Sequence, residues 1–203
     1  MHAEFEMSLM GKLKFFLGIQ INQSLEGTYI HQSKYTNELP KKFDMSECKM
    51  SKTPMHPTCI LEKEEVFAKV EHKVYIGMIG SLLYLTASRP DILFTVSLFS
   101  CFQSYPRESH LIAVKRIFRY LKGMINLGSL YRKSKDYKLL GYYDVEYAGE
   151  RLERKRTSGS CHFLGDSLIS WSSKRQSTIA LSTIKVEYIA ASKCNTQMLY
   201  MKS

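Results

Sequence analysis

The chain has 203 residues, of which 44% are hydrophobic and 12% aromatic, so it can bury a core in one large domain or two small ones. This composition excludes a chain that is disordered throughout. Lysine and arginine outnumber the acidic residues by 29 to 19, and the net charge of +10 favours an anionic partner, of which nucleic acid is the usual one, although a solvated basic surface would show the same balance.

The N-terminal third reads as a hairpin followed by a helix. The first residues carry acids before the apolar ones and no basic leader, so no signal peptide is expected. Apolar and β-branched residues at 13–21 and 27–35 flank the turn-forming "NQSLEG", which predicts a β-hairpin. Helical spacing follows at 34–43, but Pro40 lacks a backbone donor, so this helix should break or kink there.

The middle of the chain is predicted to be helical. The most apolar stretch, 74–87, ends at "SRPD" and is too short to span a bilayer, so it reads as a buried helix and no membrane partner is expected. A further apolar segment lies at 92–102, and 108–124 is strongly amphipathic. The polar side of that last helix is basic and could follow phosphates, or be an ordinary solvated face; its bases are Lys115, Arg116, Arg119 and Lys122.

The last third should form strands and then a helix. Strands are expected at 139–147, near 160–164 and near 167–172, with a basic loop between the first two and a helix from about 183. This β-β-β-α order, after a hairpin and helices, gives a mixed α/β (α+β) fold class. The polar, basic segment before the strands is the expected linker, which divides the chain into 1–130, 131–138 and 139–203.

Two carboxylates in this last third are candidate metal ligands. Asp144 lies inside an otherwise apolar strand, and Glu187 lies in the first turns of the helix that follows. Hydrolysis of phosphodiesters by two metal ions needs such hard oxygen ligands on rigid elements. The alternative is that Asp144 faces water at a strand end beside Glu146, and that Glu187 is a surface residue.

Long segments of the sequence resemble a known family. The C-terminal segments are similar to the ribonuclease H region of copia-type LTR retrotransposon Pol polyproteins: "GYYDVEYAG", "RTSGSCHFLGDSLISWSSKRQSTIALST" and "VEYIAAS". The earlier segments resemble the C-terminal end of the family's reverse transcriptase: "FFLGIQI", "IHQSKYTNELPKKF", "YIGMIGSLLYLTASRPDILFTVSLFS" and "HLIAVKRIFRYLKG". The resemblance covers nearly the whole chain in the family's order.

The resemblance implies roles for individual residues. Asp144 and Glu187 match carboxylates that bind Mg²⁺ (or Mn²⁺) for cleavage of RNA in RNA–DNA hybrids. The helix at 110–122 resembles part of the thumb and connection region that lies along the hybrid. The tip of a hairpin that grips the primer strand corresponds to Phe16, Leu17 and Gly18.

The chain also departs from the family's pattern. It contains no adjacent pair of aspartates such as the polymerase uses, and no aspartate after Asp166, where the family has its later nuclease ligands. Glu146 stands in place of a second Asp, Lys185 in place of a Glu, and Pro40 in place of a Leu. Lys185 at the start of a helix opposes the helix dipole and loses a capping bond. An incomplete sheet would also expose the edge of its first strand, which invites self-association or a partner chain.

Three hypotheses follow. The first is a segment of a copia-type polyprotein without catalytic competence, and the second is a Mg²⁺-dependent nuclease whose missing ligands come from another chain. The third is a nucleic-acid-binding or capsid-interacting module that uses the helix at 110–122 and the loop residues Arg154, Lys155 and Arg156. The five scattered cysteines, with no C-x-x-C pair, indicate reduced thiols and an intracellular location, cytoplasmic or nuclear, with virus-like particles implied by the family.

Overall fold

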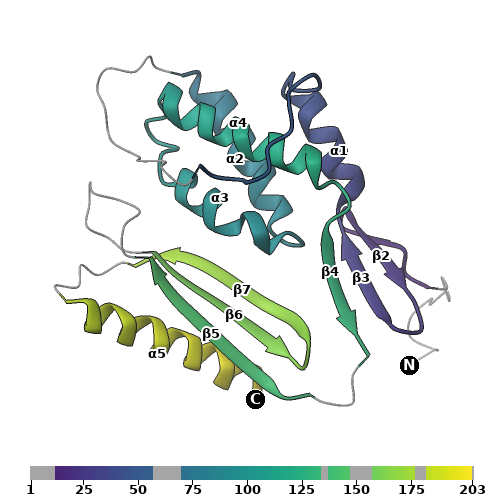
Figure 1. Ribbon diagram of the computed structural model, residues 1–203, viewed down its shortest axis with the longest axis vertical. Coiled ribbons are helices and arrows are strands. Elements are labelled where there is room, and N and C mark those ends of the chain that lie inside the picture. Colours follow the sequence, from purple (N-terminus) through teal and green to yellow (C-terminus); the bar gives the residue numbers. More distant parts are fainter. Residues whose placement is uncertain (1–11, 57–69, 134–136, 147–156, 177–181, 203) are drawn as a thin grey trace, which may run out of the picture.

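The computed structural model of the chain describes residues 12–56, 70–133, 137–146, 157–176 and 182–202. They form two antiparallel sheets and a group of helices (Figure 1). The mixed helix and sheet content agrees with the expected α+β class. Among the described residues, no helix is both long enough and apolar enough to cross a membrane.

The first sheet joins the N-terminal hairpin to a strand from much later in the chain. Its strand order is β1-β2-β3-β4, and its strands are β1 (Phe15–Phe16), β2 (Ile19–Gln23), β3 (Gly27–His31) and β4 (Gly128–Arg132). The hairpin of β2 and β3 confirms the prediction, and β1 adds a second, tighter hairpin. Tyr131 and Arg132 pair with Thr28 and Gly27, so the expected linker loses its first two residues to this sheet.

The helices form the main hydrophobic core. They are α1 (Ser33–Lys42), α2 (His72–Leu85), the 3-10 turn η1 (Pro90–Ile92), α3 (Leu93–Ser100) and α4 (Glu108–Gly123). The apolar side of α4 faces the core as its spacing predicted; Val114, Ile117, Phe118 and Leu121 are inaccessible, and Leu111 is partly buried. The predicted break at Pro40 does not occur. Pro40 lies in the last turn of α1, where the lost donor costs one bond, and the helix continues to Lys42.

A buried arginine fastens the turn after α2 to the end of α4. Arg89 is 1% exposed, and its Nε and Nη2 atoms donate to Asp91 Oδ1 at 2.9 Å and Oδ2 at 2.7 Å. Its Nη1 donates to the Met124 carbonyl at 2.8 Å, and the Tyr120 hydroxyl donates to Asp91 Oδ2 at 2.9 Å. The guanidinium also lies 5.8 Å from the Tyr120 ring centroid. All three guanidinium nitrogens of Arg89 and both carboxylate oxygens of Asp91 in this "SRPD" turn are therefore paired.

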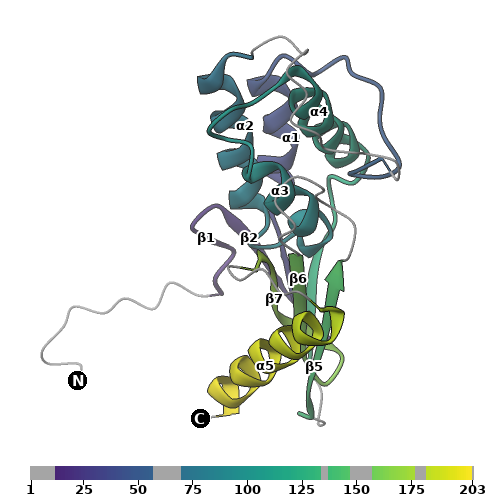
Figure 2. The same ribbon diagram turned by 90° about the vertical axis from the view of Figure 1, so that its left-hand side faces the viewer.

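The second sheet lies beneath the helices and is covered on its far side by the last helix. Its strands are β5 (Leu139–Glu146), β6 (Thr157–Leu164) and β7 (Ser167–Arg175), in that order, and α5 (Thr183–Lys202) follows. Figure 2 shows α5 on the face of this sheet that is turned away from α3. The expected β-β-β-α order is confirmed. Among the described residues, β5 pairs with β6 alone, and the prediction of a partner at its outer edge stays a prediction.

Hydrogen bonds between described residues join this sheet to the rest of the molecule. The Trp171 indole on β7 donates to the Thr86 carbonyl at the end of α2, at 2.9 Å. The backbone N–H of Arg132 in β4 donates to the Ser167 hydroxyl at 3.1 Å. The two sheets and the helices therefore meet at β7.

We expect the stability of the folded chain to fall as the pH drops below about 6.5, the ordinary pKa of histidine. Burial, and secondarily the charge of Arg107, lower the pKa of His110, which is 1% exposed and whose Nδ1 accepts the Arg107 backbone N–H at 3.2 Å. Below pH 6.5 the unfolded chain therefore takes up a proton that the folded chain refuses, down to the lowered folded-state pKa. His110→Gln should flatten this dependence in urea unfolding between pH 7.5 and 5.5, because glutamine can still accept that backbone bond.

His72→Gln, at an exposed position at the start of α2, is the matched control and should leave the pH dependence unchanged. An equal flattening by both variants would contradict the assignment to His110.

Candidate nucleic-acid interface

The turn between β1 and β2 presents three apolar side chains to solvent. Phe16 pairs with Ile19, so Leu17 and Gly18 form a two-residue turn, and their φ angles of 47° and 77° are both left-handed. Such a turn matches the twist of the flanking strands. Phe15, Phe16 and Leu17 are 53%, 54% and 75% exposed, and we call these three residues with Gly18 the β1–β2 tip.

Tyr84 of α2 holds the β1–β2 tip in place. Its hydroxyl donates to the Leu17 carbonyl at 2.5 Å, and its ring packs edge-on against Tyr35, with the ring centroids 4.9 Å apart. A Cβ atom at Gly18 would lie 2.0 Å from that hydroxyl oxygen, so glycine is required there both by φ and by space. The tip is thus a fixed projection of the fold.

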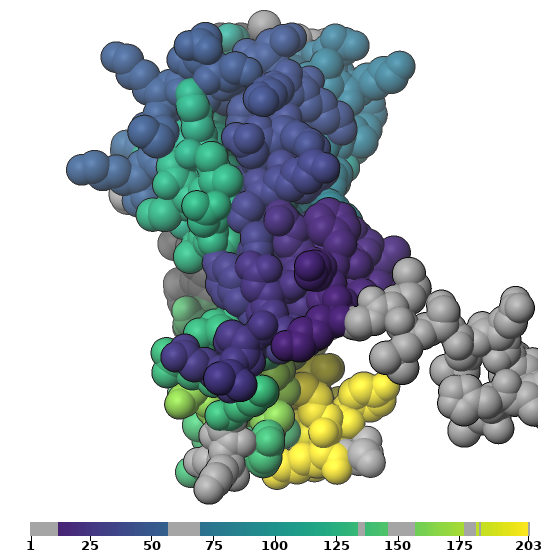
Figure 3. Space-filling view, turned by 90° about the vertical axis from the view of Figure 1, so that its right-hand side faces the viewer, coloured from purple at the N-terminus to yellow at the C-terminus, as the bar shows by residue number. Residues whose placement is uncertain are grey.

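The basic side of α4 is only partly available to a ligand. Arg116 donates to the carbonyl and hydroxyl oxygens of Thr53 at 3.2 and 2.9 Å. Lys122 donates to the carbonyls of Ser46 and Cys48. These two residues therefore hold the segment after α1 against α4, a role that the sequence did not reveal. Figure 3 shows α4 and this part of the chain side by side above the purple β1–β3 strands.

The other two bases of α4 differ from this pair and from each other. Lys115 is exposed. The Arg119 Nε is buried and has no hydrogen-bond partner. Of the four predicted phosphate contacts, Lys115 is therefore the one whose charge is most open to solvent.

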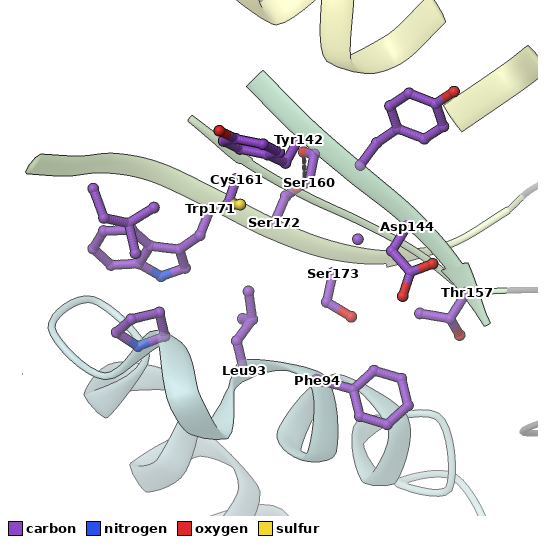
Figure 4. A pocket seen from close by; sticks show the side chains of 14 residues that line it. Leu93, Phe94, Tyr142, Asp144, Thr157, Ser160, Cys161, Trp171, Ser172 and Ser173 are labelled. Atoms are coloured by element: carbon purple, nitrogen blue, oxygen red, sulfur yellow. Dashed lines mark hydrogen bonds between the residues drawn. The ribbon is translucent and has the colours of Figure 1, made fainter. Parts of the chain in front are cut away.

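Asp144 lies on the face of the second sheet that is turned towards α3. It lines a pocket of about 540 Å³ together with Tyr142, Trp171, Leu93 and Phe94. Figure 4 shows the Asp144 carboxylate pointing into this space, away from α5. The side chain is exposed, and its Oδ1 accepts the backbone N–H of Val145 at 2.8 Å.

Glu187 lies on α5, which covers the opposite face. A Cβ atom at Gly141 would lie 2.5 Å from Met198 Sδ and 2.9 Å from Cys194 Sγ, so odd-numbered positions of β5 face α5 and Asp144 does not. Glu187 is itself exposed. The structure therefore does not bring the two candidate ligands together, and they do not fit one Mg²⁺ ion. No three His, Cys, Asp or Glu side chains among the described residues form a group that could hold a metal.

Comparison with known proteins assigns the chain to a family. The profile of the reverse transcriptase (RNA-dependent DNA polymerase) family matches residues 1–57. The retrovirus-related Pol polyprotein from transposon RE1 of Arabidopsis thaliana is 34% identical over 192 residues, which are 95% of this chain and 13% of that protein. The retrovirus-related Pol polyprotein from transposon TNT 1-94 of Nicotiana tabacum is 33% identical over 98% of this chain and 16% of its own length.

The chain belongs to the copia-type retrotransposon Pol family. An uncharacterized mitochondrial protein of Arabidopsis thaliana is 32% identical over 93% of this copia-type chain, which in turn covers 78% of that protein. The chain thus spans a small part of the Pol polyproteins and most of the mitochondrial protein. No solved structure matches it.

At the start of α5 in this copia-type chain, Lys185 occupies the position where the family pattern has a Glu. The Lys185 backbone N–H donates to the Ser182 hydroxyl at 3.4 Å, so Ser182 caps the helix and Lys185 is the third residue after it. The Lys185 side chain is exposed. The predicted contacts Arg154, Lys155 and Arg156 lie outside the described residues, and so does the side chain of Glu146.

Sequence reasoning missed two features of the structure. Tyr84, which holds the β1–β2 tip, sits in a continuous apolar run, and nothing in that run marks the hydroxyl. The second feature is the alternation of hydroxyl residues in "TSGSCHF" and "SLISWSS". A period of two places such residues on one face of a sheet, and that signal was readable.

Proposed function

We propose that this chain is a nucleic-acid-contacting part of a copia-type Pol polyprotein that holds an RNA–DNA hybrid and performs no cleavage with its own carboxylates. In this proposal the first sheet and the helices are the end of a reverse transcriptase, and β5 to α5 are part of a ribonuclease H-like unit. The observation that carries it is the β1–β2 tip, with Leu17 exposed in a left-handed backbone conformation.

The tip is costly for folding. A non-glycine residue in the left-handed region costs about 1–2 kcal/mol, and exposed apolar side chains return none of it through burial. Strained backbone held in place by its surroundings is typical of functional sites. Here the Tyr84 hydroxyl donates to the Leu17 carbonyl and supports this turn. An apolar, rigid projection suits contact with the sugars and bases of a nucleic acid strand, which present apolar surface between the phosphates.

Position and charge support the same proposal. The tip lies within residues 1–57, which match the reverse transcriptase profile. The net charge of +10 attracts a polyanion from a distance, and Lys115 offers an exposed cation on α4. The separation of Asp144 and Glu187 by the second sheet supports holding of the hybrid without cleavage.

Leu17→Asn tests the tip. Asparagine tolerates the left-handed region better than leucine does, so the melting temperature should stay equal or rise, while the apolar contact is lost. We expect the affinity for a labelled RNA–DNA hybrid to fall about tenfold, a typical cost for losing one good apolar or stacking contact. Fluorescence anisotropy at several salt concentrations measures it, and the slope of log affinity against log salt should not change.

Leu25→Asn is the matched control, because Leu25 is 93% exposed in the turn between β2 and β3. It should leave hybrid affinity unchanged. Equal losses in the two variants would contradict a role for the tip. Cleavage of the RNA strand with Mg²⁺ or Mn²⁺, abolished by Asp144→Asn, would overturn the non-catalytic part of the proposal.

A further inference from the structure

A second pocket lies between the second sheet and α5, on the face opposite Asp144. Its volume is about 650 Å³, within the range of small-molecule sites. The sheet side of the pocket consists of cross-strand pairs of β6 and β7. From one end to the other these pairs are Ser158 with Lys174, Ser160 with Ser172, and His162 with Ser170.

A polar sheet face beneath a helix is unusual, because a covering helix normally buries apolar side chains. The apolar contacts of α5 are made by Val186, Ala190 and Cys194, and Cys194 reaches β5 through the Tyr142 carbonyl at 3.8 Å. The flank of α5 beside β7 contributes Lys193 and further polar side chains to the pocket. The serine side chains of β6 and β7 therefore face the polar side of α5 across the pocket.

The lining suits a phosphorylated ligand. Lys174 and Lys193 are both exposed, and none of the described residues that line the pocket is acidic. The Ser160 and Ser172 hydroxyls are 2.8 Å apart, and since one donates to the other, the second keeps a hydrogen for an outside acceptor. Lysines and hydroxyl donors are the groups that bind phosphate oxygens in proteins.

His162 supplies the complementary group. The ring is 1% exposed, and its Nε2 lies 3.3 Å from the Cys194 carbonyl and 3.5 Å from the Cys194 Sγ. The tautomer that donates from Nε2 to this carbonyl has Nδ1 as an acceptor. Nδ1 is buried and has no partner. Buried polar atoms nearly always have one, so this nitrogen marks the place of a missing donor, such as a sugar hydroxyl or a base amino group.

We propose that this pocket binds a phosphate ester of nucleotide size. Lys174 belongs to the strand pair at one end of this sheet side, and Lys193 precedes Cys194, whose carbonyl contacts His162 in the pair at the other end. We therefore expect a ligand with two phosphates to contact both lysines, and a mononucleotide to contact one of them. The ligand is therefore either a short stretch of single-stranded nucleic acid or a free nucleotide, which share this chemistry.

The test titrates the full chain with inorganic phosphate, AMP and 5′-phosphorylated (dT)₄, and measures binding by isothermal titration calorimetry. Lys174→Gln and Lys193→Gln should each weaken oligonucleotide binding about tenfold, as expected for loss of one charge-assisted hydrogen bond. Lys185→Gln removes an exposed charge from α5 outside the pocket and should have little effect. Melting temperatures of the variants check that all three remain folded.

The pattern of losses separates the two ligand sources. Oligonucleotide binding that both pocket variants weaken supports a strand site, and AMP binding that one variant weakens supports a free-nucleotide site. Absence of binding by the wild-type chain, or an equal loss with Lys185→Gln, overturns the proposal. Leu17→Asn should leave these titrations unchanged, so failure of the tip and failure of the pocket are distinguishable.

Discussion

Replacing Arg89 by methionine should lower the free energy of unfolding by about 2–3 kcal/mol, because the bonds of a buried guanidinium are lost while the Asp91 carboxylate left behind keeps access to solvent. The guanidinium makes two bonds to Asp91 and one to the Met124 carbonyl, and it is 1% exposed. Methionine fills much of the volume but leaves the Asp91 carboxylate with the Tyr120 hydroxyl as its remaining side-chain donor. Urea unfolding followed by circular dichroism measures the change.

Arg116→Met is the matched control on the exterior of α4. Its guanidinium donates to Thr53 and is partly exposed, so we expect a loss within about 1 kcal/mol. Similar losses for the two variants would show that the Arg89 cluster does not hold α4 in place. The double variant with Asp91→Leu should recover part of the loss, because it removes the carboxylate left without its cation.

Gly141→Val should weaken the attachment of α5 to the second sheet by about 3 kcal/mol, the upper end of the cost of overpacking. A Cβ atom there would lie 2.5 Å from Met198 Sδ and 2.9 Å from Cys194 Sγ. The flexible Met198 side chain can move aside. The Cys194 side chain is short and buried, and its Sγ donates to the Tyr142 carbonyl of β5. Faster hydrogen exchange in α5, with α2 and α4 unaffected, is the expected signature.

Gly159→Val provides the comparison in the neighbouring strand. A Cβ atom at Gly159 would meet just the Ser172 carbonyl oxygen, at 3.8 Å, which is ordinary contact. This substitution should be neutral or slightly stabilising, since glycine is unfavourable within a strand. If both variants loosened α5 equally, the loss would come from the strand and not from the close approach of α5 to Gly141.

Elements with a strong local pattern could be predicted from the sequence. The apolar stripe of α4 and the apolar run of α2 defined both helices, and the strand-turn alternation defined β5 to β7. β4 could not be predicted, because its five residues have no pattern of their own and become a strand through pairing with β3. Of the break or kink predicted at Pro40, the break was wrong, because the effect of a proline on a helix depends on how close the helix end lies.

The candidate site was less predictable than the fold. Residue types and spacing selected Asp144 and Glu187 as candidate ligands. Whether the two side chains face each other depends on which face of the sheet α5 covers, and the spacing of residues in the sequence does not determine that face. The α4 bases were read as one face, yet Arg116 and Lys122 bind backbone and hydroxyl oxygens of residues 46–53. A base that holds the fold and one that holds a ligand look alike in sequence. The β1–β2 tip was predicted from a family resemblance, and its geometry became visible only in the structure.

The pairing of β3 with β4 constrains the order of events during synthesis. Gly27 pairs with Arg132 and His31 with Gly128, so α1 to α4 all lie between the two paired strands. On the ribosome, β3 emerges long before β4, and the edge of β3 that will pair with β4 stays open while α1 to α4 are synthesised. Pairs so distant in sequence form late, and open edges invite association with other chains. A nascent chain interrupted anywhere between α1 and β4 would keep that edge exposed.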